Sequence, residues 1–277
     1  MWNEISEKVS YHVVYDISIL DALYYANNSG FAGIQIAVEA PHLSFEYLSD
    51  SQCKKINSIC DKLNSYITLH GPDIITSLFT TNSRLKQGIF SYYTDLFTFA
   101  KKVNARLITI HLGEYTTFPT DTEPQVEISA KDMEIYQITF HENLKTLLKL
   151  ADHQFIICVE NYNFRPFILD ILKYYLTEEQ LWLCWDLAKT YNKDNNKNNV
   201  LERFYIENIK SIKQIHLHDL NSYGKGHKVI GSGIIDFIYY LKQLDFSKVM
   251  DFCIEVRPRE KAYESLQNLK NLIKSKG

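Results

Sequence analysis

The sequence has no long hydrophobic run. Its 277 residues contain no stretch of about 18 or more consecutive apolar residues, so no membrane-spanning helix is expected. The first ten residues, MWNEISEKVS, lack the basic and then apolar order of a secretory signal peptide. The five cysteines are scattered and form no CxxC pair, which favours free thiols in a reducing compartment. We therefore expect a cytoplasmic protein.

An excess of basic charge is also missing. The 30 Lys and Arg residues are outnumbered by 33 Asp and Glu residues, which gives a formal net charge of −3. This balance argues against a protein whose main task is to neutralise a phosphate backbone, so nucleic acid is not an expected partner. No linker rich in proline or glycine and no change in composition divides the chain. We expect one domain, residues 1–277.

Eight short apolar runs recur along the chain, and several of the segments between them have helical spacing. The runs are residues 11–15, 33–38, 66–70, 106–111, 155–160, 181–186, 212–218 and 251–256. Helices are predicted from residues 18–30, 49–65, 132–153 and 260–275. Alternating strands and helices predict an α/β fold with a parallel sheet, and eight units favour a closed (β/α)8 TIM barrel. An open Rossmann-like sheet is the alternative, but no GxGxxG follows the first run.

Each of the last six predicted strands has, at its end or within two residues of it, a residue that binds metals or exchanges protons. These residues are His70, His111, Glu160, Asp186, His216 and Glu255. Because the carboxyl ends of barrel strands converge on one mouth, the set predicts a common site. Carboxylates with imidazoles suit a divalent metal such as Mn²⁺, Mg²⁺, Co²⁺, Fe²⁺ or Zn²⁺. Two polar loops, residues 113–125 and 190–199, follow strands and are expected at the same face.

A layer of small or weakly polar side chains is predicted beneath this mouth. It consists of the residues two positions earlier in each strand: Thr68, Thr109, Cys158, Cys184, Gln214 and Cys253. The cysteines suggest a thiolate metal site as an alternative. We favour small core residues, since carboxylates and imidazoles occupy the layer above.

The stretch KQIHLHDLN, residues 213–221, places two histidines on one face of a strand. Burying an imidazole costs free energy unless it finds a partner. A metal would satisfy His216. His218 and Asp219 are expected to orient the ligands or to contact substrate.

Seven short motifs carry a resemblance to a known family. They are LHGP (69–72), IHLGE (110–114), VENY (159–162), CWDLAK (184–189), IHLHDLN (215–221), GHKVIGSGIIDF (226–237) and IEVRP (254–258). In this order they resemble the xylose-isomerase-like TIM barrels, which include sugar phosphate isomerases, sugar epimerases and endonuclease IV. The resemblance spans nearly the whole chain. It also suggests a homodimer or homotetramer.

The resemblance implies a metal held by Glu160, Asp186, His216 and Glu255. In the epimerases of the family the two glutamates also exchange a proton with the substrate carbon, one on either face. The metal polarises the carbonyl and stabilises an enediolate. The implied function is a metal-dependent sugar or sugar-phosphate isomerase or epimerase with a small carbohydrate substrate.

Endonuclease IV gives the alternative function, metal-dependent phosphodiester hydrolysis. Its pattern matches His70 and His111, which allows a second metal with Glu160 as the bridge. Its third metal site needs ligands at positions where this sequence has Lys189 and Lys225. An ammonium offers a metal no lone pair, which argues against abasic-site cleavage.

Lys189 also departs from the epimerases, which usually have a histidine at this position. We expect it to bind a substrate phosphate or carboxylate or to donate a proton; the alternative is an ion pair with Asp186 or Glu160. Arg257 is a second anion contact, unless it pairs with a helix carboxylate. His227, in the loop after the seventh strand, is expected near the ligands. A barrel that only binds a small ligand remains a third function class.

Overall fold

Eight parallel strands form a closed barrel in which spatial order follows chain order. The computed structural model describes residues 1–72, 75–121, 127–162, 164–178, 180–192 and 194–276. The strands are β1 (Val9–Val13), β2 (Gly33–Ala37), β3 (Tyr66–His70), β4 (Leu107–Ile110), β5 (Ile156–Glu160), β6 (Trp182–Asp186), β7 (Ile212–Leu217) and β8 (Asp251–Ile254). Pairing of β1 with β8 closes the ring and excludes the open sheet. The predicted TIM barrel is confirmed.

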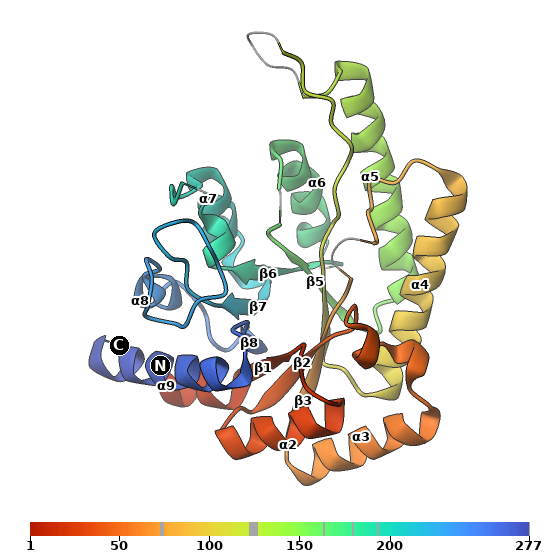
Figure 1. The fold of residues 1–277 in the computed structure, drawn as a ribbon. Coiled ribbons are helices and arrows are strands. Elements are labelled where there is room, and N and C mark those ends of the chain that lie inside the picture. Colours follow the sequence, from red (N-terminus) through yellow and green to blue (C-terminus); the bar gives the residue numbers. More distant parts are fainter. Residues whose placement is uncertain (73–74, 122–126, 163, 179, 193, 277) are drawn as a thin grey trace.

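Helices surround the barrel and connect its strands (Figure 1). The α-helices are α1 (Trp2–Ile5), α2 (Ile19–Ser29), α3 (Asp50–Lys62), α4 (Ser83–Lys102), α5 (Ala130–Ala151), α6 (Pro166–Thr177), α7 (Asn199–Glu207), α8 (Phe237–Leu241) and α9 (Arg259–Lys276). Short 3-10 helices are η1 (Ser6–Lys8), η2 (Pro41–Leu43), η3 (Phe45–Tyr47), η4 (Ala188–Thr190) and η5 (Ile209–Ser211). The four helices predicted from spacing correspond to α2, α3, α5 and α9.

Local sequence signals explain where the predicted helices begin and end. The Ser18 side chain accepts a hydrogen bond from the Asp21 N–H at the start of α2, and Gly30 ends that helix at φ 84°. At α3, Ser49 and Gln52 form a reciprocal capping box. These caps fix the helix ends through contacts that are local in the chain.

The first strand lies two residues earlier in the chain than the sequence predicted. The run 11–15 was expected, but β1 is Val9–Val13, and Tyr15 is 75% exposed beyond its end. A shift of two residues keeps every side chain on the same side of the sheet, because the side-chain period is two. Ser10 and His12 therefore point into the barrel in either case.

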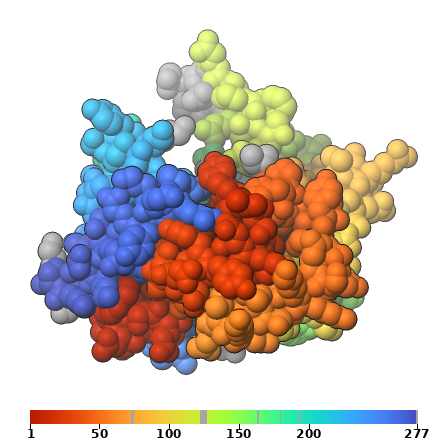
Figure 2. All heavy atoms as spheres, turned by 60° about the horizontal axis from the view of Figure 1, so that its bottom comes forward, coloured from red at the N-terminus to blue at the C-terminus, as the bar shows by residue number. Residues whose placement is uncertain are grey.

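The two ends of the chain lie side by side, with the red N-terminal residues against the blue α9 (Figure 2). On the far side, α5 and the chain leading into it extend beyond α4 and α6 (Figure 1). The predicted loop 113–125 belongs to this extension, although its residues 122–125 lie outside the described residues. Among the described helices, none combines the length and apolar composition that a membrane crossing needs.

Candidate metal centre

Four side chains meet at the carboxyl ends of β5 to β8. One ligand atom each from Glu160, Asp186, His216 and Glu255 lies within 4.8 Å of the others. All four side chains are buried, with at most 3% exposure. The sequence predicted these residues at one mouth, and the structure brings them together.

His216 faces two of these carboxylates without a hydrogen bond to either. Its Nδ1 lies 3.3 Å from Glu160 Oε2 and 3.4 Å from Glu255 Oε1. This buried nitrogen has no hydrogen-bond partner among the described residues. Burial alone would lower the pKa of His216, but the two carboxylates raise it to about 9. A cation among these atoms would satisfy the nitrogen and both oxygens, so the residues fit a divalent metal.

Two more histidines contact Glu160. His111 Nε2 lies 2.8 Å and His70 Nε2 3.2 Å from Glu160 Oε2. His70 Nδ1–H donates to the carbonyl of Gly71 at 2.8 Å. This contact fixes the orientation of the ring and directs Nε2 at Glu160 Oε2, which accepts a hydrogen bond from it; a metal bound at Nε2 would take the place of that proton. His70, Glu160 and His216 form a second candidate group for a metal.

Lys189 lies between the ligand carboxylates. Its Nζ donates to Glu160 Oε1 and lies 3.5 Å from Asp186 Oδ2. The turn of η4 directs it there, because Asp186 Oδ1 accepts the backbone N–H groups of Ala188 and Lys189 at 2.9 and 3.2 Å. Nζ also lies 5.2 Å from the centre of the Tyr162 ring. The structure thus shows the ion pairs that were the alternative interpretation of Lys189.

Opposing effects act on the two glutamates. Burial would raise the pKa of Glu160, but Lys189, His111 and His216 hold it well below its ordinary value. Burial would likewise raise the pKa of Glu255, but His216 and His12 hold it well below its usual range. Both are ionised carboxylates in this arrangement, which is the form that binds metals.

His218 makes a hydrogen bond to one of the ligands, Asp186. The backbone N–H of His227 donates to His218 Nδ1 at 2.9 Å, so the proton lies on Nε2, which donates to Asp186 Oδ2 at 3.1 Å. The ring of His227 stacks on that of His218 at 4.3 Å between centroids. Only 2% of His218 is exposed. Its contact is with a ligand, in agreement with the orienting role considered for it.

Asp219 holds the loop after β7. Its carboxylate accepts the backbone N–H groups of Leu220, Gly231, Gly233 and Ile235 at 2.8 to 3.1 Å. It is fully buried. The other interpretation of this aspartate, a substrate contact, does not fit a carboxylate with four backbone donors.

A cavity of about 300 Å³ opens above the metal-ligand cluster. Its lining includes His70, His111, Lys189, His227, Glu255 and Arg257. Arg257 Nη2 lies 3.4 Å from His227 Nδ1, which donates to the carbonyl of Glu255 at 2.9 Å. Glu255 reaches the cavity, whereas Glu160 is covered by its cationic neighbours.

Sequence reasoning missed His12. It projects from β1 into the same cavity, with Nδ1 3.6 Å from Glu255 Oε1 and neither ring nitrogen hydrogen-bonded to a described residue. Burial holds the pKa of His12 well below its ordinary value. The signal was present, because the alternation that placed His216 inside the barrel applies to β1 as well.

Asn161 was also missed. Its amide donates to the carbonyl of Asp186 at 2.9 Å and accepts the Asp186 N–H at 2.7 Å. It thereby fixes the backbone of one ligand to the strand that carries another. Beside it, Tyr162 stacks on His111 with 4.9 Å between ring centroids.

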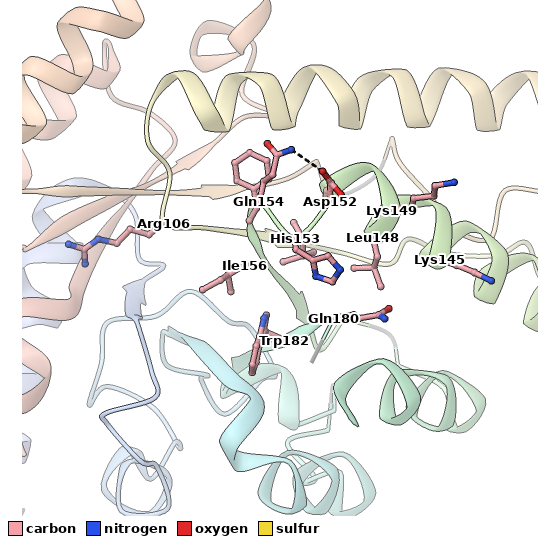
Figure 3. Close-up of a pocket in the computed structure, with 13 residues that line it drawn as sticks. Arg106, Lys145, Leu148, Lys149, Asp152, His153, Gln154, Ile156, Gln180 and Trp182 are labelled. Carbon is pink, nitrogen blue, oxygen red and sulfur yellow. Dashed lines mark hydrogen bonds between the residues drawn. The ribbon is translucent and has the colours of Figure 1, made fainter. Parts of the chain in front are cut away.

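A larger cavity, of about 600 Å³, lies at the opposite end of the barrel (Figure 3). It is bordered by the first residues of β5 and β6, Ile156 and Trp182, and by the exposed His153 and Gln180. Active sites of TIM barrels lie at the carboxyl ends of the strands. The smaller cavity above the ligands is therefore the candidate site.

Solved structures with a similar fold include two kinds of enzyme. A D-tagatose 3-epimerase-like protein is 20% identical, with a TM-score of 0.72 over 97% of both chains. The D-psicose 3-epimerase of Clostridium cellulolyticum is 15% identical, with a TM-score of 0.68 over 95% of this chain and 97% of that one. Endonuclease IV of Thermus thermophilus is 14% identical, with a TM-score of 0.71 over 97% of this chain and 99% of that one.

No curated protein sequence matches the chain significantly. A model of the xylose isomerase-like TIM barrel matches residues 23–272, which is most of the sequence. The closed barrel and the buried His and Glu groups at its mouth agree with that match. The chain belongs to the xylose isomerase-like TIM barrel family.

Proposed function

We propose that this protein is a metal-dependent isomerase or epimerase of a sugar or sugar phosphate. The observation that carries the proposal is the pair Glu160 and Glu255, whose carboxylates both lie close to His216 Nδ1, at 3.3 and 3.4 Å. With Asp186 they complete a set of four ligand atoms beneath a cavity. The names of the similar epimerases support a sugar as the substrate class.

Asp186 and His216 would hold a divalent ion together with both glutamates. A bound ion would polarise the carbonyl and adjacent hydroxyl oxygens of the substrate and stabilise the negative charge that follows proton removal. Glu255 lines the cavity and is the carboxylate placed to take a proton from substrate. Glu160 would return a proton on the other face, which requires that its contact with Lys189 opens.

The remaining residues of the mouth suit an anionic or strongly polar substrate. Arg257 and Lys189 bring two permanent cations to the cavity, and His227 adds an imidazole between Arg257 and the Glu255 backbone. A guanidinium binds phosphate or carboxylate through two parallel hydrogen bonds. This favours a sugar phosphate or sugar acid over a neutral ketose.

The proposal is tested with protein purified without chelators. Elemental analysis is expected to give one divalent ion per chain, and a panel of ketoses, ketose phosphates and sugar acids is expected to show exchange of a substrate carbon-bound proton with solvent deuterium. Glu255→Gln should abolish the exchange. Ion binding without proton exchange on any member of the panel would favour a barrel that only binds its ligand.

Phosphodiester hydrolysis is the second candidate, and one observation favours it. His70 and His111 both contact Glu160 Oε2, so a second ion held by these histidines would share Glu160 with the first ion. Two zinc ions per chain, one of them lost in His70→Ala, together with cleavage of a phosphodiester substrate, would replace the isomerase proposal. Lys189 and Lys225 stand where a third ion would need ligands.

A further inference from the structure

We propose that Lys189 is a built-in counter-ion that competes with the divalent ion for Glu160 and Asp186, and that ion binding releases its ammonium into the mouth. The inference rests on the proposed metal centre but not on the proposed reaction. Lys189 Nζ contacts Glu160 Oε1 and lies 3.5 Å from Asp186 Oδ2. Two of the four ligand side chains therefore already hold a cation that belongs to the chain.

The ion-free cluster needs such a cation. Glu160, Asp186 and Glu255 are three buried carboxylates within one group of ligand atoms. Unpaired charges in the interior are strongly unfavourable, so a chain without a metal must supply positive charge from its own side chains. Lys189 does so from a neighbouring turn, and its side chain remains 25% exposed at the cavity.

The carboxylates of Glu160 and Asp186 cannot hold both cations at full strength. A divalent ion at ligand distance, about 2.0–2.2 Å from a carboxylate oxygen, would repel an ammonium held by the same group. Lys189 has a flexible four-carbon stem, and the cavity that it lines gives it space to move. After release, the ammonium lies in the same cavity as Arg257, where a substrate anion can reach it.

Ion affinity tests the competition. With Co²⁺ alone as the probe, calorimetric titration of Lys189→Met should give a Kd at least about tenfold lower than that of the unaltered chain, because the competing charged hydrogen bonds are gone. Arg257→Met is the matched control. It removes one cation from the same cavity without breaking a contact to a ligand carboxylate, so its Kd should change by at most about threefold.

Equal or weaker Co²⁺ binding by Lys189→Met would overturn this inference alone, since the metal centre would still bind its ion. An equally large gain in Arg257→Met would also overturn it, because general charge repulsion would then explain the effect. Absence of Co²⁺ binding in all forms would overturn the metal centre itself, and this inference with it.

The displacement can be measured in the unaltered chain. Acetic anhydride modifies free lysine amines, and peptide mass spectrometry reads the extent at residue 189. Co²⁺ should raise the rate at Lys189 several-fold, while Lys197, paired with Glu202 at 2.9 Å, serves as the internal reference. An unchanged or lower rate at Lys189 would show that its ammonium stays on the carboxylates, contrary to the proposal.

Discussion

Two buried carboxylates inside one barrel have opposite surroundings. Asp251, at the start of β8, accepts hydrogen bonds from Tyr66 Oη at 2.8 Å, Thr68 Oγ1 at 3.3 Å and Gln214 Nε2 at 2.5 Å. Its partners are neutral, and burial raises the pKa of Asp251. Glu160, one layer higher, is contacted by Lys189 and by three histidines, and Lys189, His111 and His216 lower its pKa despite burial.

The difference separates a structural layer from a functional one. In the lower layer, hydroxyl and amide donors satisfy Asp251 and connect β3, β7 and β8. The upper layer leaves His216 Nδ1 buried without a hydrogen bond to the described residues. A buried polar atom without a hydrogen bond destabilises the folded state, and a bound ligand that contacts the atom removes this cost. We therefore expect substitutions in the lower layer to change the stability of the fold, and substitutions in the upper layer to change ion binding.

The largest effect is expected from His216→Ala. The zinc affinity of structural sites, about 10–16 kcal/mol, is shared among four ligands, so loss of one should weaken ion binding by about 100- to 1,000-fold. Titration with Co²⁺ measures this. Asp251→Ala is the matched variant from the lower layer, and its Kd should stay within about threefold of the original. Similar ion losses in both variants would contradict the separation of the layers.

Asp251→Ala should instead destabilise the fold. Removing the shared acceptor leaves Tyr66, Thr68 and Gln214 with unsatisfied donors in a buried layer, at a cost of about 3 kcal/mol in the free energy of unfolding. Urea denaturation of the ion-free chain measures the loss. Asp251→Asn keeps an acceptor oxygen and should lose clearly less. If both variants unfold at the same urea concentration as the original, the lower layer does not carry the stability assigned to it.

The sequence predicted the upper layer better than the lower one. Strand ends are marked by a change from apolar to polar residues, so the order of residues was enough to assign His70, Glu160 and His216 to one mouth. Asp251 begins its strand, and the sequence does not show that a residue there reaches across the barrel to Tyr66 and Thr68. That contact depends on strand tilt and register.

The position of the Lys189 ammonium could not be predicted either. Residue order placed Lys189 at the mouth, but a four-carbon side chain can reach either the cavity or the carboxylates below it. The backbone N–H contacts of η4 with Asp186 Oδ1 orient the turn and decide between the two. The contacting residues are only two and three positions apart in the sequence, but the contacts form only once the turn has folded. The pattern of apolar and polar residues therefore does not predict them.

The smallest of the expected effects concerns His218, which is not one of the four ligands but orients one of them. His218→Ala removes the donor to Asp186 Oδ2 and leaves that carboxylate free to rotate, so Co²⁺ affinity should fall by about tenfold. His218→Gln retains an N–H donor and should recover part of the loss, which a packing defect alone would not explain. Calorimetric titration of both variants decides the point. Equal affinity in the unaltered chain and in His218→Ala would mean that Asn161 and the turn of η4 already fix Asp186 without the imidazole.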